Sequence, residues 1–200
     1  MGDTETTRRR WDRQARYYDA TGGWLERIFV GDARDWACAR ASGRTLEVAI
    51  GTGRNLPRYG GDVALTGIDL SPGMLAKARQ KAAARGSTAD LREADAERLP
   101  LDDASFDTVV CTLALCAIPD REAAVREMVR VLRPGGRLVL VDHYERRWRT
   151  AHPADLAQAA GLRTEERRKT RLGIIERYAA RKPVDVPWSR RQVGFPSRSG

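Results

Sequence analysis

The sequence predicts an α/β domain built on a doubly wound, mostly parallel sheet with helices on both faces. Three observations support this fold class. Short apolar segments alternate with helical segments from about residue 45 onward, these short segments are apolar almost throughout, and the first of them runs into a glycine turn. The chain has 200 residues, of which 42% are hydrophobic, so it is long enough to bury one core of its own.

The part of the chain before the first strand is expected to be helical. Residues 6–18 are polar and rich in Arg, and residues 24–41 carry apolar side chains at helical spacing. A Ser-Gly pair ends the second of these segments. We therefore expect a helical cap over residues 1–43, followed by the sheet-containing domain over residues 44–183.

Seven segments have the composition of strands. They span residues 45–50, 63–70, 89–94, 106–111, 137–142, 162–166 and 173–181. After the second of them, Ser71 followed by Pro72 marks the start of a helix, and Asp120 begins another helix that ends at an Arg-Pro-Gly-Gly turn. A shorter helix is expected over residues 153–160. Residues 184–200 mix Pro, Gly, Ser and Arg, which predicts a basic, disordered tail.

The net charge of +9 is concentrated late in the chain, where residues 144–200 carry 14 Arg and Lys against 6 Asp and Glu. Such a segment could contact anionic lipid or nucleic acid, or could simply be a soluble, Arg-rich surface. No RNA-binding motif with interleaved aromatic residues accompanies the charge, which disfavours nucleic acid. The sequence has no apolar run near the roughly 18–20 residues that cross a bilayer and no signal segment at its start, so we expect a cytoplasmic protein.

The glycine turn after the first predicted strand lets a ligand approach the backbone. Gly51 and Gly53 stand where a Cβ atom would collide with that ligand. A dinucleotide fingerprint needs a third glycine three residues later, and Leu56 stands there instead, which argues against a nicotinamide cofactor. Glu47, at the start of the turn, would repel a pyrophosphate. It favours a cationic ligand, which it could bind directly or by holding the glycine loop through hydrogen bonds.

Two further acids follow predicted strands. Asp69 ends the second strand, 18 residues after Gly51, where a carboxylate can bind the hydroxyls of a ribose. Asp95 follows the third strand and could accept a hydrogen bond from an adenine amino group. Met74 could pack on the face of the purine or could be a core residue. Each acid alone could be a solvated surface charge, but the ordered set indicates a cationic cofactor that contains a nucleoside.

Five stretches of this sequence together resemble the class I S-adenosylmethionine-dependent methyltransferases. They are LEVAIGTG (46–53), GIDLSPGML (67–75), DAERLPL (95–101), SFDTVV (105–110) and RVLRPGGRL (130–138). Within that superfamily the chain looks like the ubiquinone/menaquinone-methyltransferase-like group. Residues 110–116 together with Asp142 and His143 look closer to methyltransferase-like thiol enzymes and bacterial phospholipid N-methyltransferases. The resemblance implies a Rossmann-like, doubly wound, seven-stranded, mostly parallel sheet with an antiparallel C-terminal strand.

The resemblance also implies S-adenosylmethionine as the cofactor, with a role for each position that matches. The residues around its methionine part would be Glu47, Ala49, Gly51 and Gly53. Such families usually have a glycine where this chain has Ala49, and we expect that alanine to tighten the loop.

The remaining matched positions would bind the nucleoside part of the cofactor or face the acceptor. Asp69 would bind the ribose. The adenine would lie beside Leu70 and Met74, and its amino edge would face Asp95 and Ala96. Thr112 would line the passage between the cofactor and the acceptor.

Methyl transfer from a sulfonium is an in-line displacement, so catalysis needs mainly alignment of the reactants and exclusion of water. A base is needed only where the acceptor loses a proton. His143, at the end of the fifth strand, is the candidate base, and its alternative role is a structural hydrogen bond. No metal is expected, because no cluster of ligands has metal spacing. The three cysteines, Cys38, Cys111 and Cys116, are expected to be reduced and buried.

The acceptor is expected to be a small apolar or amphipathic molecule. Four aromatic side chains near the N-terminus could close over it or touch a lipid surface, or could pack the helices onto the sheet: Trp11, Tyr17, Tyr18 and Trp24. The alternative acceptors are a phospholipid amine, a thiol, and an intermediate of quinone or natural-product biosynthesis. The phospholipid alternative implies peripheral contact with a membrane. A hypothesis of another class is a methyltransferase-fold module that binds RNA through the basic C-terminal region.

Overall fold

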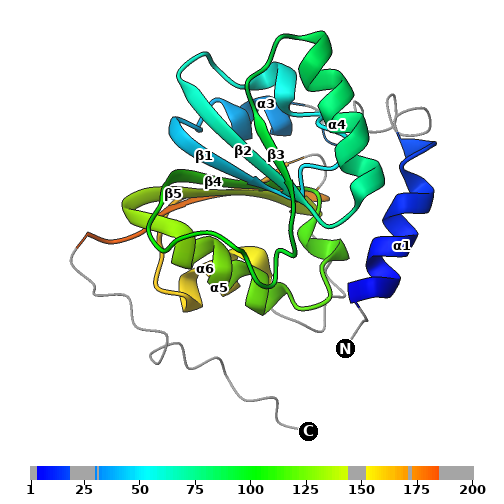
Figure 1. Cartoon of the computed structure of the whole chain (residues 1–200). Helices are drawn as coiled ribbons and strands as arrows, with labels where there is room; N and C mark the ends of the chain where they lie inside the picture. The colour runs from blue at the N-terminus through cyan, green and yellow to red at the C-terminus, as the bar shows by residue number, and fades with distance from the viewer. Residues whose placement is uncertain (1–3, 19–29, 31, 144–151, 171–172, 185–200) are drawn as a thin grey trace, which may run out of the picture.

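The computed structural model describes residues 4–18, 30, 32–143, 152–170 and 173–184, which form layers of helices on either side of one sheet (Figure 1). The strands are β1 (Gly43–Val48), β2 (Val63–Asp69), β3 (Asp90–Glu93), β4 (Phe106–Thr112), β5 (Leu132–His143), β6 (Arg163–Thr170) and β7 (Ile175–Arg181). The helices are α1 (Thr4–Gln14), α3 (Ala33–Cys38), α4 (Pro72–Ala84), α5 (Arg121–Val131) and α6 (Pro153–Ala159), with the short 3-10 turns η1 (Leu56–Arg58) and η2 (Leu115–Ala117).

The seven strands form a single sheet in the order β3-β2-β1-β4-β5-β7-β6. β1 pairs in parallel with β2 on one side and with β4 on the other. Between β1 and β4 the strand order reverses, and at such a switch point the loops at the carboxyl edge diverge and open a crevice. β7 runs antiparallel to both β5 and β6, which confirms the predicted fold class together with its antiparallel C-terminal strand.

The two faces of the sheet bury separate parts of the core. One face packs on α5 and α6 through a large cluster that includes Leu46 of β1 and Met128 of α5, both fully buried. On the other face, Val110 of β4 meets Ala37 of α3. Successive side chains of a strand point to opposite faces, so Glu47 points away from the cluster that holds Leu46.

Two strands are longer than the sequence predicts. β5 begins at Leu132 because Leu132 pairs with Phe106; the register then shifts, and Gly135 within the Arg-Pro-Gly-Gly stretch has a left-handed φ of +76°. β6 continues to Thr170 although nearly all of its residues are polar or charged. Pairing with β7 provides its backbone hydrogen bonds, and charged side chains suit a strand at the edge of a sheet.

The helices before the sheet are described only in part. α1 ends at Gln14, short of the predicted end at Tyr18, and α3 covers Ala33–Cys38 within the predicted helix over 24–41. Trp24, the segment 144–151 and the predicted tail beyond Val184 lie outside the described residues. Of the helices in the described part of the chain, none combines the length and the apolar character that crossing a membrane requires.

Candidate active site

A cavity of about 850 Å³, open to solvent, lies at the carboxyl ends of β1, β2 and β4. One wall, which we call the strand-end wall, consists of residues in the turns after β1, β2 and β3: 49–52, 68–70 and 94–97. The opposite wall, which we call the α1 wall, consists of residues from α1 and from the segment after β4: Thr4, Thr7, Trp11, 112–114 and 117–119.

Most of the predicted site residues meet at this cavity. Those that line it are Ala49, Gly51, Asp69, Leu70, Met74, Asp95, Ala96 and Thr112. Three others lie elsewhere. Glu47 is buried behind the glycine turn, Gly53 lies against the Leu56 side chain, and His143 is half-buried at the end of β5, outside the cavity lining.

The glycine turn has a left-handed backbone at alternate positions. The φ angles are +56° at Ala49, +59° at Gly51 and +75° at Gly53. A Cβ atom on Gly53 would lie 2.6 Å from the Leu56 side chain and 3.2 Å from the Ala78 backbone, so this glycine lets the turn pack closely against α4. At Gly51 a Cβ atom would meet no protein atom within 4 Å, so the backbone conformation alone favours glycine there.

Ala49 adopts a conformation that glycine adopts without steric cost. We expect Ala49→Gly to raise the free energy of unfolding by about 0.5–1 kcal/mol, because the strain of a left-handed alanine exceeds the entropy that glycine adds to the unfolded chain. Urea denaturation measures this change. Ala104→Gly is the matched control, since Ala104 has a φ of +51° outside the cavity lining. If Ala104→Gly raises the free energy of unfolding and Ala49→Gly does not, the glycine turn is not strained at Ala49.

Asp69 joins the glycine turn to the start of α4. Its Oδ2 accepts the backbone N–H of Gly51 at 2.8 Å, and its Oδ1 accepts that of Ser71 at 2.9 Å. The residue is 9% exposed, and burial raises the pKa of its carboxyl group above the usual value for Asp. A carboxylate offers about four acceptor positions, so Asp69 keeps capacity for the hydroxyl groups of a ligand in the cavity.

Asp12 of α1 reaches the same turn from the opposite wall. Its Oδ1 accepts the backbone N–H of Gly73 at 3.0 Å and also the hydroxyl of Ser71. A second connection lies after α1, where Arg54 of the glycine turn donates from Nη2 to the backbone oxygen of Tyr18 at 2.8 Å. The Arg54 guanidinium also lies over the Tyr18 ring, 4.8 Å from its centre. The α1 segment is therefore fastened at two points to the turns of the strand-end wall.

Removal of the Asp12 carboxylate should release α1. We expect trypsin to cleave Asp12→Ala within this segment about tenfold faster than the wild type, because losing two hydrogen bonds of roughly 1 kcal/mol each populates the undocked helix. The cleavage sites are Arg8, Arg9, Arg10, Arg13 and Arg16. Timed digestion followed by mass spectrometry gives the rate at each site. Gln14→Ala is the control, since Gln14 is an exposed residue of the same helix, and equal rates for both variants would contradict the docking role.

A buried polar network lies behind the glycine turn. Glu47 accepts from Asn55 Nδ2 at 2.7 Å on Oε1 and from the Tyr59 hydroxyl at 2.9 Å on Oε2. Arg34 Nη1 donates to Asn55 Oδ1 at 3.1 Å and to Thr112 Oγ1 at 2.8 Å. Burial raises the pKa of Glu47 to about 7. The network thus connects α3, the end of β1, the glycine turn and the end of β4.

Sequence reasoning does not find Arg34, Asn55 or Asp12. One signal for Arg34 is present, because it shares the buried face of α3 with Ala37 and Cys38, where a charged residue is unexpected. Nothing comparable marks Asp12, which lies among charged residues of an exposed helix.

His143 lies where β5 pairs with β7, opposite Ile175. Its backbone N–H donates to the Asp142 carboxylate at 2.7 Å, and the same carboxylate accepts the backbone N–H of Cys116 at 3.2 Å. Burial raises the pKa of Asp142 above its usual value. This carboxylate therefore ties the end of β5 to the η2 turn.

The cysteines divide into two kinds. Cys38 and Cys111 are buried as predicted, but Cys116 is exposed, because it lies in the η2 turn at the surface rather than in the core. Burial raises the pKa of Cys38 to about 12, which keeps it a neutral thiol. In the described ranges, His, Cys, Asp and Glu form no group of three or more that could hold a metal ion.

A crevice at the switch point of a doubly wound sheet, with a glycine turn and an acid at the end of the second strand, defines a domain that binds a nucleoside-containing cofactor. Residues 46–140 match the model of the family described as "Methyltransferase domain". The match agrees with the predicted resemblance to methyltransferases and with S-adenosylmethionine as the methyl donor.

Two of the curated relatives that this chain resembles have names that differ in the acceptor. A phosphatidylethanolamine N-methyltransferase of Cereibacter sphaeroides is 47% identical over 106 residues, which are 52% of this chain and 52% of that protein. A demethylmenaquinone methyltransferase of Deinococcus radiodurans is 44% identical over 129 residues, which are 59% of this chain and 54% of that protein. This chain spans about half the length of these relatives.

A solved structure confirms the fold. The crystal structure of a SAM dependent methyltransferase from Aquifex aeolicus has a TM-score of 0.68 to this protein, covering 85% of this chain and 97% of that one at 18% sequence identity.

Proposed function

We propose that this protein is an S-adenosylmethionine-dependent methyltransferase that acts on a small apolar or amphipathic acceptor. The contrast between the two walls of the cavity carries this proposal. The strand-end wall presents the carboxylates of Asp69 and Asp95, which suit a ribose and an adenine amino group. The α1 wall presents the side chains of Trp11, Leu113 and Ile118, which suit an apolar acceptor.

When bound, the cofactor supplies a sulfonium methyl group that a nucleophile displaces in line. The protein itself positions the reactants and encloses them. Asp69, oriented by the N–H groups of Gly51 and Ser71, would hold the ribose. Trp11, on a helix fastened by Asp12, would keep water from the acceptor side of the cavity. Rate acceleration would then come mainly from alignment.

Calorimetry tests the cofactor, with S-adenosylmethionine, S-adenosylhomocysteine and NAD as ligands. We expect the first two to bind and NAD not to bind. Methyl-labelled cofactor, incubated with a demethylated quinol, phosphatidylethanolamine and a small alkyl thiol, then identifies the class of acceptor from the labelled product. If neither adenosyl ligand binds, the proposed function is wrong.

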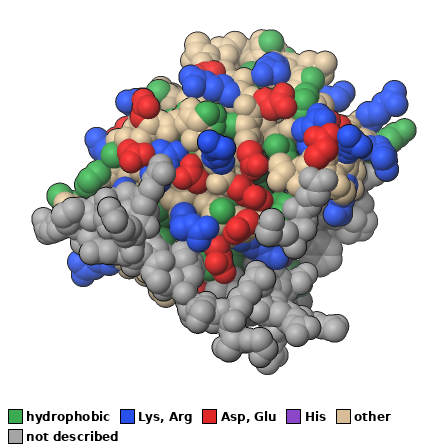
Figure 2. All heavy atoms as spheres, turned by 60° about the horizontal axis from the view of Figure 1, so that its bottom comes forward, with side chains coloured by type: hydrophobic (Ala, Val, Ile, Leu, Met, Phe, Trp, Pro, Cys, Tyr) green, Lys and Arg blue, Asp and Glu red, His purple; other side chains and the backbone are tan. Residues whose placement is uncertain are grey.

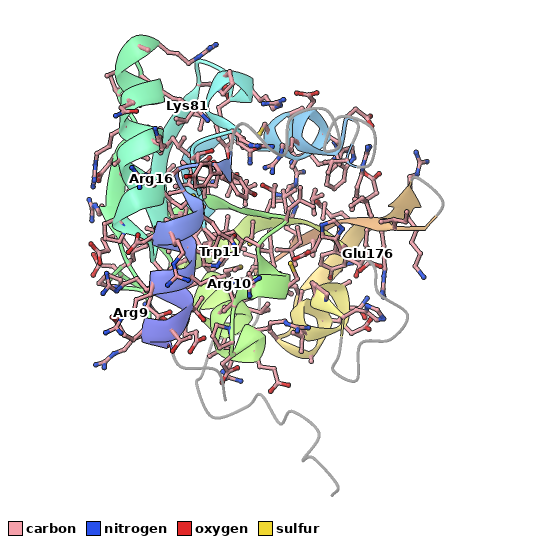
Figure 3. All side chains as sticks on the ribbon, turned by 90° about the vertical axis from the view of Figure 1, so that its right-hand side faces the viewer. Arg9, Arg10, Trp11, Arg16, Lys81 and Glu176 are labelled. Carbon is pink, nitrogen blue, oxygen red and sulfur yellow. The ribbon has the colours of Figure 1, made fainter. Side chains whose placement is uncertain are left out.

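A second candidate is a phospholipid amine at a membrane surface. The observation that favours it is the position of α1, which contributes Trp11 to the cavity. Three exposed basic residues lie on α1 and a fourth follows its end: Arg9, Arg10, Arg13 and Arg16. Figure 3 shows Arg9, Arg10, Trp11 and Arg16 along this one segment. By contrast, Figure 2 shows basic and acidic side chains next to one another on the face toward α5 and α6. A relative named phosphatidylethanolamine N-methyltransferase agrees with this candidate.

Vesicle binding distinguishes this candidate. A protein that takes its acceptor from an anionic membrane should sediment with vesicles containing phosphatidylglycerol and phosphatidylethanolamine, and should be released by salt. Replacing Arg9, Arg10, Arg13 and Arg16 by Gln should remove that binding and leave affinity for S-adenosylhomocysteine unchanged. Failure of the wild type to bind such vesicles at low salt would exclude this candidate.

A further inference from the structure

Ser71 is a junction between the cofactor side of the cavity and helix α1. It is fully buried, and its hydroxyl donates its one proton to Oδ1 of Asp12 on α1. Its backbone N–H donates to Oδ1 of Asp69 at 2.9 Å, and its Oγ accepts the N–H of Met74 at 3.1 Å as the N-cap of α4. One buried residue therefore connects the carboxylate of α1 with the carboxylate at the end of β2.

Asp12 also supplies an acceptor to the first turn of α4. The first N–H groups of a helix have no partner within the helix, and here the N–H of Gly73 donates to Oδ1 of Asp12 at 3.0 Å. Figure 1 shows α1 beside α4. No residue of α1 itself, Thr4–Gln14, is buried, so the docking of this helix depends on polar contacts more than on buried apolar area. A helix held in this way docks with a modest free energy that a ligand can change.

The segment that α1 holds is also the segment that would hold the cofactor. Asp69, Leu70 and Met74 line the cavity. Ser71 and Gly73 lie between them in the sequence and donate to α1. Docking of α1 and binding in the cavity thus depend on the same conformation of one short turn.

The charges of this turn indicate that the two events favour each other. Asp12 and Asp69 are carboxylates that accept from the same serine, and like charges in such proximity repel. Burial, and to a smaller extent the charge of Asp12, raises the pKa of the Asp69 carboxyl group. Ribose hydroxyls that donate to Asp69 would stabilise its negative charge, so Asp12 would then approach at a lower cost. An occupied cavity therefore favours docked α1.

Docking of α1 matters for the acceptor because this helix contributes Trp11 and two threonines to the α1 wall. We infer that Asp12 is a positioning residue that, through Ser71, couples the docking of α1 to the binding of the cofactor at Asp69. Each event strengthens the other by the same factor, so cofactor binding stabilises the acceptor side of the cavity. The inference rests on the proposed function, because it needs a cofactor whose ribose binds Asp69.

Trypsin digestion with and without saturating S-adenosylhomocysteine tests this coupling. In the wild type, the ligand should slow cleavage within residues 8–16 about tenfold, as expected for a typical coupling between two sites. In Asp12→Ala the rates with and without ligand should differ by about twofold or less. Asp12→Asn keeps an acceptor oxygen but no charge, so its protection should be intermediate. Glu5→Gln is the matched control, since it removes an acid that bonds to two arginines of α1, and its protection should equal that of the wild type.

Calorimetry measures the reciprocal effect. Asp12→Ala should bind S-adenosylhomocysteine about five- to tenfold more weakly than the wild type, because coupling acts equally in both directions. If Asp12 only fastened the helix, without coupling, this affinity would not change. Ser71→Ala removes the shared hydroxyl and should lose most of the protection from trypsin, which gives a second variant that does not alter Asp12.

The outcomes are separable. If the wild type binds S-adenosylhomocysteine but is cleaved at the same rate with and without it, the inference is wrong while the proposed function stands. The same conclusion follows if the ligand protects Asp12→Ala as strongly as the wild type. If the wild type does not bind the ligand, the proposed function itself fails. Digestion of the wild type needs no variant, so the test holds even if a variant does not fold.

Discussion

Asp69→Ala is expected to weaken the binding of S-adenosylhomocysteine by about 100-fold or more. Two effects add in this variant. The cofactor would lose the carboxylate that accepts its ribose hydroxyls, at roughly 1.5–3 kcal/mol for each hydrogen bond to a charged group. The N–H groups of Gly51 and Ser71 would also lose the acceptor that holds them 2.8 and 2.9 Å away, so the turns that line the cavity would shift.

Calorimetry measures this change, with Asp62→Ala as the control because Asp62 is exposed just before β2. Asp69→Asn separates the two effects. Its amide oxygen can still accept one of the two backbone N–H groups, so we expect a smaller loss of affinity than in Asp69→Ala. An Asp69→Ala variant that binds normally would refute the assignment of this cavity to the cofactor.

Glu47 is expected to make the stability of the protein fall as the pH rises toward neutrality. Burial raises its pKa from 4.5 to about 7, so between these values the folded protein keeps a proton that the unfolded chain has lost. The stabilisation from this group is complete below pH 4.5 and is lost as the pH rises through 7. The whole change amounts to roughly 3 kcal/mol in the free energy of unfolding.

Glu47→Gln removes this titration with little change of shape. The amide can still accept from Asn55, and the Tyr59 hydroxyl can turn to accept from it. Urea denaturation of both proteins over a series of pH values measures the difference between them. Burial also raises the pKa of Asp69 and Asp142, and both groups are present in the two proteins that are compared. A difference that stays constant across pH would contradict a protonated Glu47.

The strand-end wall could be predicted from the sequence because local patterns encode it. Its residues stand at the ends of predicted strands or in the turns that follow them, and neighbouring parallel strands bring their ends to one edge. The weakest pattern is that of β3 before Asp95, whose sequence DLRE is mostly polar. Gly51 and Asp69 are 18 positions apart, yet pairing of β1 with β2 places them in contact. The same logic locates Asp95 and Thr112.

The α1 wall and the network behind the turn could not be predicted in this way. Asp12 meets Ser71 across 59 positions of sequence, and Arg34 meets Thr112 across 78. Neither contact follows from a strand pattern or a turn type, because each depends on where a helix docks on the finished sheet. The length of β6 could not be predicted for the same reason. Its sequence is charged, and it forms a strand because it pairs with β7, not because it is hydrophobic.

The strand-end wall lies wholly inside the family match, and the α1 wall lies inside it only through residues 112–114 and 117–119. The family match begins at residue 46, so α1 lies outside it, while the turns that would hold the donor lie inside it. Within the first 18 residues, Asp12 and Tyr18 contact the turns of the donor half, so mutations at the other exposed positions are expected to disturb it least. Enzymes that share this ancestry could diversify by exchanging one short N-terminal segment that keeps an acid at the position of Asp12. That segment is therefore the part of the protein to change when a different acceptor specificity is wanted.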